Sequence, residues 1–210
     1  FSANQRAPKD YELFAHGVHV ATHAYEIGQP TNRLEQGKQL DVGGEYKQGP
    51  HTFGWTAFVS QFSNYLSLQP TGADTGGADP LPIYRFEGVR ARFQGMEVSA
   101  KMRMVGGQAA LWHDNASLGT VDLEVRADSV RAKDLTHDSD LPRIAPMRLG
   151  AEALWARHAW GARVGFVHAA AQNRVPNNGV QPGVTTQAYT LWHAALNYHM
   201  HQGPTHWLLF

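Results

Sequence analysis

The stretch GVRARFQGMEVSAKMRM, residues 88–104, decides the fold. From Met96 to Met104 every second residue is apolar, and the residues between them are small or charged. Successive side chains of a strand point to opposite faces, so the stretch predicts a strand with one apolar face and one charged face. A helix would scatter the same charges around its circumference. The function of the chain depends on what each of the two faces contacts.

Other segments repeat this alternation, among them residues 40–46, 118–128, 147–155, 160–166 and 189–201. Residues 53–68 are rich in aromatic side chains and change parity along the way, which predicts a strand with a bulge that switches faces. Partial strands at residues 1–5 and 207–210 bring the expected count to about nine. No convincing helix is predicted.

The connections between these strands alternate between long and short. The long ones are residues 6–37, 69–83, 131–143 and 172–187, and short turns are expected at Gln48, Gly106, His158 and Gln202. This arrangement is typical of an outer-membrane β-barrel. The apolar face is built from Met, Ala, Trp and Tyr, which favours lipid contact over the Leu, Ile and Val core of a soluble antiparallel fold. A soluble all-β binding module is the alternative.

Composition narrows the functional classes. The 210 residues include 18 basic and 18 acidic side chains, so there is no net charge to attract nucleic acid, and no cysteine. Histidine is abundant, with 12 residues. No Ser-His-Asp order, phosphate-binding loop or paired carboxylate pocket stands out, so no enzyme is predicted. In lipid every backbone polar group needs a partner. Nine strands with a partial one at each end therefore predict a segment of a larger barrel.

Several short strings resemble the barrel of TonB-dependent outer-membrane receptors, in order and spacing that fit nearly the whole chain. They are QRAP at residues 5–8 followed by EL at 12–13, HGVHVATHAYEIG at 16–28 leading to LE at 34–35, NYLSL at 64–68, LPIY at 81–84, ARFQGME at 91–97, DSVRA at 128–132, LPRIAPMRLG at 141–150 and YTL at 189–191. The Gly-x-His-x-Ala-Thr string and the Leu-Pro-Arg-Ile string are most similar to the zinc-uptake branch of that family.

The resemblance implies an all-β fold, an antiparallel transmembrane β-barrel of 22 strands of which this chain covers about nine, near strands 13 to 21. It implies outer-membrane lipid as surroundings, long extracellular loops and short periplasmic turns. It also implies a plug domain at the N-terminal end of the whole receptor, which engages TonB. Residues 1–210 would be a partial barrel domain without the plug, and this part alone would not transport.

The strongest candidate site is a histidine cluster in the first long loop, made of His16, His19, His23 and Glu26. Neutral imidazole is a good ligand for zinc and other late first-row ions. The resemblance points to His19 as the position that faces the entry site. The spacing does not match a tetrahedral site, so partners from other loops or from the plug are needed. The alternative is that these are solvated loop histidines in a histidine-rich chain.

A second group of candidates lies on the polar parity of the strands and would line the lumen. It consists of Glu97, Lys101, Arg103, His193 and His199, with His201 beside them. The histidines could line a conduction path, or they could be ordinary lumen polarity. Asp122, Glu124, Arg126 and Asp128 would form charge ladders with Glu97, Lys101 and Arg103, in which neighbouring strands place opposite charges across from each other. We interpret this ladder as structural or as a contact surface for the plug.

The sequence therefore predicts a barrel segment of a receptor that imports a scarce nutrient, with zinc as the cargo and no prosthetic group. A siderophore or haem receptor is the alternative within transport.

Overall fold

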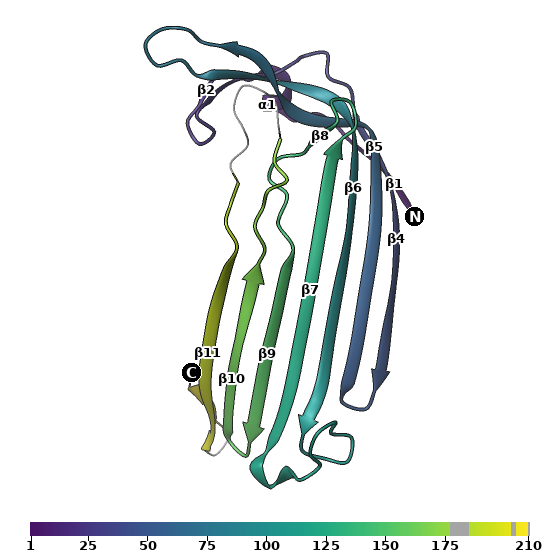
Figure 1. The fold of residues 1–210 in the computed structure, drawn as a ribbon, viewed down its shortest axis with the longest axis vertical. Helices are drawn as coiled ribbons and strands as arrows, with labels where there is room; N and C mark the ends of the chain where they lie inside the picture. Colours follow the sequence, from purple (N-terminus) through teal and green to yellow (C-terminus); the bar gives the residue numbers. More distant parts are fainter. Residues whose placement is uncertain (177–184, 203–204, 210) are drawn as a thin grey trace.

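The protein is built around a single antiparallel sheet. The computed structural model describes residues 1–176, 185–202 and 205–209, and the side chains of residues 1–176 and 185–200. Nine strands pair in sequence along this sheet (Figure 1), which confirms the expected count. They are β1 (Ser2–Arg6), β4 (Glu35–Gln48), β5 (His51–Asp74), β6 (Pro82–Val105), β7 (Thr120–Asp134), β9 (Arg148–Arg157), β10 (Trp160–Ala169), β11 (Tyr189–Gln202) and β12 (Thr205–Leu209).

Smaller elements join the sheet at the end where the long connections gather, which we call the loop end. They are the helix α1 (Asp10–Phe14), the strand pair β2 (His16–His19) and β3 (Ala24–Ile27), and β8 (Ser139–Asp140). The prediction that the chain has no helix is therefore wrong, because α1 is a short helix. No helix in the described part of the chain is long and apolar enough to cross a membrane.

The opposite end of the sheet, the turn end, holds two of the predicted short turns. β4 and β5 are joined through Gly49, whose φ of 56° is left-handed, and β9 and β10 through His158 at φ 52°. The prediction of a short turn at Gly106 is wrong, because residues 106–119 form a longer, folded connection between β6 and β7. Residues 111–113 donate backbone hydrogen bonds to carbonyls of the last turn-end residues of β6, so the chain continues beyond the sheet before it returns. The turn expected at Gln202 includes residues outside the described part.

The long connections contain more strand than the sequence indicated. β5 and β6 continue to Asp74 and from Pro82, so the loop expected at 69–83 shrinks to residues 75–81. A register shift between Pro70 and Asp74 lets the pair absorb a proline that lacks an N–H group. Similarly, β7 reaches Asp134 within the loop expected at 131–143. Residues 177–184 of the loop expected at 172–187 lie outside the described part.

The two faces of the sheet have opposite character, as the alternation predicts. One face, the lipid face, carries a band of exposed apolar side chains, and an exposed apolar surface of this extent indicates a non-aqueous neighbour. The cross-strand register places these residues side by side. Representative members are Leu40, Val42, Tyr46, Trp55, Met96, Val164, Trp192 and Leu196, each at least 36% exposed.

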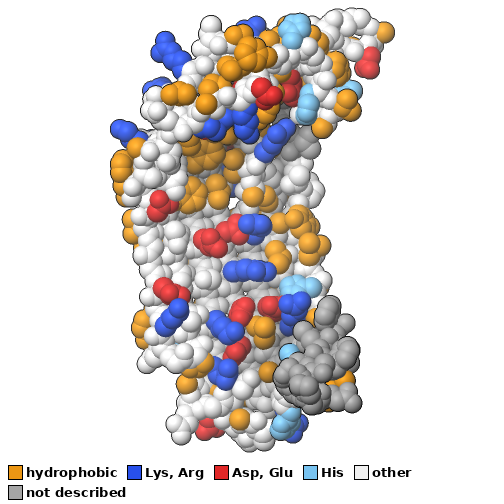
Figure 2. Space-filling view, turned by 180° about the vertical axis from the view of Figure 1, so that it is seen from behind, with side chains coloured by type: hydrophobic (Ala, Val, Ile, Leu, Met, Phe, Trp, Pro, Cys, Tyr) orange, Lys and Arg blue, Asp and Glu red, His pale blue; other side chains and the backbone are white. Residues whose placement is uncertain are grey.

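The other face, the lumen face, is charged. Figure 2 shows Lys and Arg side chains interspersed with Asp and Glu side chains over the middle of this face. The face turns apolar toward the loop end, where Phe62, Tyr65 and Phe93 form a cluster of three rings with centroids 5.2–5.5 Å apart. Leu141, from the connection after β8, packs on the buried Ala91 and Ala132 beside these rings. This cluster forms the apolar base of the lumen face at the loop end.

The predicted bulge lies in β5, between Phe62 and Tyr65, and is confirmed by a register shift against β6. Bulges bend the strand that carries them. Beyond it, β5 and β6 turn sideways and cross the top of the sheet, beside β2 and α1 (Figure 1). Gly88 lies opposite the bulge, where the Asn64 side chain folds over it so closely that a Cβ atom would lie 1.8 Å from Asn64 Oδ1.

Candidate ligand-entry site

A cavity of about 1610 Å³ occupies the loop end of the lumen face. Five parts of the chain line it, one of which is the connection from β10 to β11 with Gln172 and Arg174. The other four are the end of β1 with α1, the β2–β3 pair, the bent parts of β5 and β6, and the connection from β7 to β9. Its lining includes three of the predicted metal ligands, namely His16, His19 and Glu26. His23 does not line it.

The histidine segment is a strand pair rather than a free loop. β2 and β3 pair antiparallel from His16 opposite Ile27 to His19 opposite Ala24. β3 in turn pairs parallel with β6, where Tyr25 lies opposite Ile83. These strands have four residues each, too short to show an alternation in the sequence. The pairing fixes His16 and His19 to the sheet at the mouth of the cavity.

His19 contacts two polar groups of its own hairpin. Its Nδ1 atom lies 3.0 Å from Thr22 Oγ1 and 3.5 Å from Glu26 Oε1. The Thr22 hydroxyl lies 2.9 Å from the same carboxylate oxygen. The Glu26 carboxylate only accepts hydrogen bonds, so the Thr22 hydroxyl donates to it and the Thr22 oxygen accepts from His19 Nδ1. We therefore assign the proton of neutral His19 to Nδ1. Its Nε2 lone pair is then free for a ligand, in the arrangement that orients metal-binding histidines.

The other two histidines of the cluster are placed differently. His16 Nδ1 lies 3.0 Å from the Tyr25 hydroxyl, and the two rings meet edge to face. His23 is exposed at the hairpin turn with a left-handed φ of 48°. Among the residues that the structure describes, no three His, Cys, Asp or Glu side chains are grouped so as to hold a metal ion.

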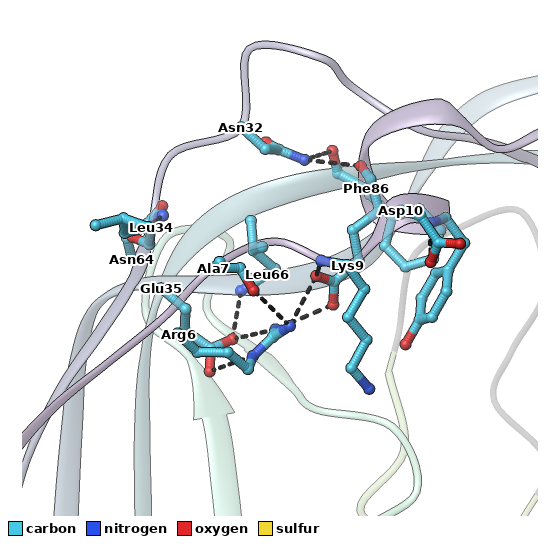
Figure 3. A network of polar contacts seen from close by, with 12 residues as sticks. Arg6, Ala7, Lys9, Asp10, Asn32, Leu34, Glu35, Asn64, Leu66 and Phe86 are labelled. Atoms are coloured by element: carbon cyan, nitrogen blue, oxygen red, sulfur yellow. Dashed lines mark hydrogen bonds and ion pairs between the residues drawn. The ribbon is translucent and has the colours of Figure 1, made fainter.

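A buried ion network forms the wall of the cavity next to the hairpin (Figure 3). The Arg6 guanidinium donates to both carboxylate oxygens of Glu12, at 2.8 and 3.0 Å, and to Glu35 Oε2 at 2.9 Å. The Glu12 and Glu35 side chains are only 6% and 13% exposed. Backbone N–H groups of Lys9 and Leu66 donate to the same two carboxylates. The network thereby ties α1 to β1, β4 and β5.

Glu12 is the group of this network whose protonation matters most. Burial by itself raises the pKa of Glu12. The hydrogen bonds from Arg6 and from the Lys9 N–H, together with the Arg6 charge, lower this pKa by more than burial raises it. The pKa therefore lies below the ordinary value of 4.5. Glu12 therefore stabilises the fold in its ionised form. Arg6, Glu12 and Glu35 were not among the sequence-predicted site residues. They lie in three of the family-like strings, which is the signal that could have identified them.

His137 also lines the cavity and was not predicted from the sequence. Its Nδ1 atom lies 2.8 Å from Oδ2 of Asp134, a carboxylate that is 1% exposed. Gln69 and the backbone N–H of Thr136 donate to the same carboxylate. The spacing Asp-x-x-His after a strand is the available sequence signal, since Asp side chains commonly cap the turn that follows. His137 faces the cavity on the side of the β7–β9 connection.

Lys101 and Arg103 lie well below the cavity, on the lumen face of β6. Lys101 Nζ lies 2.9 Å from Glu124 Oε1, and Arg103 pairs with Asp122, with its Nη2 atom 3.3 Å from Oδ2. The predicted pairing of opposite charges across β6 and β7 is confirmed at these two positions. Their side chains are engaged with the neighbouring strand.

Glu97, His193 and His199 complete the lumen candidates. Glu97 lies opposite Asp128, so the predicted pairing of opposite charges is wrong here. Asp128 instead accepts from Arg148 Nε at 3.1 Å, on the strand at its other side. His193 Nε2 lies 2.9 Å from Glu152 Oε1 on β9, two strands away. His199 is exposed on the same face. The side chain of His201 lies outside the described part.

The family is shown by a match over residues 1–209 to the model described as "TonB dependent receptor-like, beta-barrel". The chain belongs to this family. Its members lie in the outer membrane and are receptors and transporters, not enzymes. The loop end is therefore extracellular and the turn end periplasmic.

Solved structures share the fold. The copper transporter OprC superposes with a TM-score of 0.72 at 18% identity, over 93% of this chain and 27% of that one. The siderophore receptor PirA from Acinetobacter baumannii gives 0.61 at 13% identity, covering 93% and 31%. A Q482A mutant of the ferric enterobactin receptor PfeA from Pseudomonas aeruginosa, in complex with enterobactin, gives 0.62 at 17%, covering 93% and 30%. The chain thus spans less than a third of each.

Proposed function

We propose that this barrel segment belongs to a receptor that imports a scarce metal ion, with zinc as the cargo. The observation that carries the proposal is the β2–β3 pair, which holds His16, His19 and Glu26 at the mouth of the extracellular cavity. Imidazole nitrogen with a carboxylate is a donor set that suits zinc. Because no described group of three ligands is complete, the remaining ligands come from another part of the receptor.

The family implies the rest of the transport machinery. A plug domain would fill the lumen and contact TonB, and the charge ladder of the lumen face is the surface that such a plug would meet. The copper transporter among the similar folds is a reason to test copper beside zinc. Copper binds most nitrogen sites more tightly than zinc does, so affinity alone does not identify the cargo.

The test replaces His16 and His19 with Ala in the full-length receptor. We expect zinc affinity, measured by calorimetry, to fall by about 10–100-fold, because loss of a ligand costs at least as much as loss of an outer-shell partner. His23→Ala is the matched control on the same hairpin, outside the cavity lining. Growth on limiting zinc or copper, in a strain that depends on the receptor, then identifies the ion. Unchanged affinity in the double variant would remove the hairpin from the site.

A siderophore receptor is the second candidate, and the size of the cavity favours it. At about 1610 Å³ the cavity exceeds the usual 300–1000 Å³ of small-molecule sites, and Arg143 and Arg174 lie in its lining. Anionic iron chelates would suit such cations. In this case, Arg143→Gln with Arg174→Gln should weaken binding of a ferric chelate about tenfold, measured by tryptophan fluorescence, and leave zinc binding unchanged. The opposite pattern would support the zinc proposal.

A further inference from the structure

Five basic side chains gather on the lipid face just above its apolar band. They form the basic row, which consists of Lys38, Arg90, Arg92, Arg131 and Lys133, and all five are exposed. The register places Lys38, Gln61, Arg92 and Lys133 opposite one another on β4, β5, β6 and β7. Neighbouring strands lie about 4.8 Å apart, so the row spans about 15 Å. Figure 1 shows the four strands β4, β5, β6 and β7 side by side.

The position of the basic row relative to the membrane follows from the same ladders. Two residues further toward the turn end, Leu40 lies opposite Val59. Two residues beyond that level the band continues with Val42 opposite Ala57, which lies opposite Met96. The row therefore lies where the apolar band ends on the extracellular side. A cation at this depth faces the headgroups of the outer leaflet.

The basic row also borders a concavity. A hollow of about 530 Å³ lies beside the β5 bulge and is lined by Lys38, Arg90 and Arg92, with Gln5, Gln36 and Gln61 among its other lining residues. No Asp or Glu is among the described residues that line it. Two carboxylates lie next to Lys133, at one end of the row. Asp138 is 93% exposed and lies 3.3 Å from Lys133 Nζ, and Asp140 lies opposite Lys133 on β8. The exposed pair with Asp138 contributes little. Among the side chains that the structure describes, Lys38, Arg90, Arg92 and Arg131 form no ion pair with a carboxylate.

We propose that the basic row and its hollow bind the phosphate groups of a glycolipid headgroup in the outer leaflet. Guanidinium groups bind phosphate oxygens in bidentate fashion, and lysine ammonium groups add point charges. The amides of the hollow supply donors and acceptors for sugar hydroxyls. Clusters of Lys and Arg at a membrane surface recognise anionic lipids in the same way. The site is on the outside of the barrel and is independent of the cargo.

The experiment compares lipids on the full-length receptor by native mass spectrometry in detergent. The probes are lipid A with two phosphates and the same lipid without phosphates. We expect the wild-type receptor to retain the phosphorylated form selectively. Arg92→Gln with Lys133→Gln should weaken this binding by about fivefold for each charge removed, roughly 25-fold together. Heat-modifiable electrophoretic mobility verifies folding, and the single variants replace the double variant if it does not fold.

The matched control is Arg157→Gln, which removes an exposed charge on the same face at the periplasmic end of β9. It should retain the wild-type affinity for phosphorylated lipid A. Equal binding of the two lipids, unchanged binding by the Arg92 and Lys133 variants, or equal weakening by Arg157→Gln would overturn the proposal. Displacement of the lipid by inorganic phosphate at equal concentration would also overturn it, because the site would then bind a free anion rather than a headgroup.

Discussion

Replacing Arg6 with Gln should destabilise the loop end of the barrel by about 2–3 kcal/mol. The variant leaves the carboxylates of Glu12 and Glu35 buried without their cation. Breaking a buried ion pair typically costs about 3–5 kcal/mol. The expected loss lies at or below the lower end of this range because the Arg6 side chain is itself 36% exposed. Urea unfolding of the full-length receptor, followed by cleavage near α1 with a protease, measures the loss and its location.

The dependence on pH gives this prediction a second readout. The folded pKa of Glu12 lies below the ordinary 4.5, so its contribution is complete above that pH and is lost as the pH falls through the lowered value. In the Arg6→Gln variant, protonation of Glu12 removes a buried charge instead of breaking a pair. The stability difference between wild type and variant should therefore narrow below pH 4.5.

The control for Arg6 is Lys47→Gln. Lys47 also pairs with a carboxylate, Glu45, at 3.1 Å, but both side chains are at least 60% exposed. Exposed pairs contribute about 0–1 kcal/mol. A loss in this variant as large as that of Arg6→Gln, or no loss in Arg6→Gln, would show that the network at α1 does not hold the loop end together.

Replacing Val42 with Arg should destabilise the barrel by about 2–4 kcal/mol. Val42 is 53% exposed on the lipid face, in the middle of β4 and opposite Ala57. A cation on the lipid face at this depth loses its hydration without gaining a partner, and this cost is largest at the bilayer midplane. Reversible unfolding in phospholipid vesicles measures the free energy directly.

The control for Val42→Arg introduces an arginine on the opposite face of the sheet. Thr56 lies on the lumen face one level away, opposite Glu97 on β6. Thr56→Arg adds the same charge beside the carboxylate of Glu97. On its other side, Glu97 lies opposite Asp128 of β7, which is also a carboxylate. It should change stability by less than about 1 kcal/mol, or increase it. Equal effects of the two variants would contradict the assignment of the lipid and lumen faces.

Local alternation allowed the strands, the two faces and the bulge in β5 to be predicted, because a two-residue period is visible within a short window. The register between strands could not be read in this way. A shift of one residue would change which charges meet, and Glu97 opposite Asp128 shows that the pairing is not optimised at every position. The opposite charge that Asp128 meets is that of Arg148, a residue of the next strand.

The candidate site was only partly accessible from sequence. The histidines were identified by type, but their strand pair depends on hydrogen bonds to β6, which is more than 50 residues away. The network of Arg6 with Glu12 and Glu35 likewise joins residues 6 and 29 positions apart. Gly106 and Gly107 suggested a tight turn, although the backbone bonds that decide the path involve residues 111–113.

The parallel pairing of β3 with β6 has a consequence for the thermodynamics of capture. A flexible loop that closes on its ligand loses conformational entropy at the moment of binding, and this loss weakens the observed affinity. Here the backbone around His16 and His19 is already ordered by two ladders in the folded protein. Association of a cargo at these side chains then requires little further ordering of the main chain. For the proposed cargo the hairpin would be a preorganised contact surface, and the enthalpy of the contacts would be opposed by a smaller entropic loss.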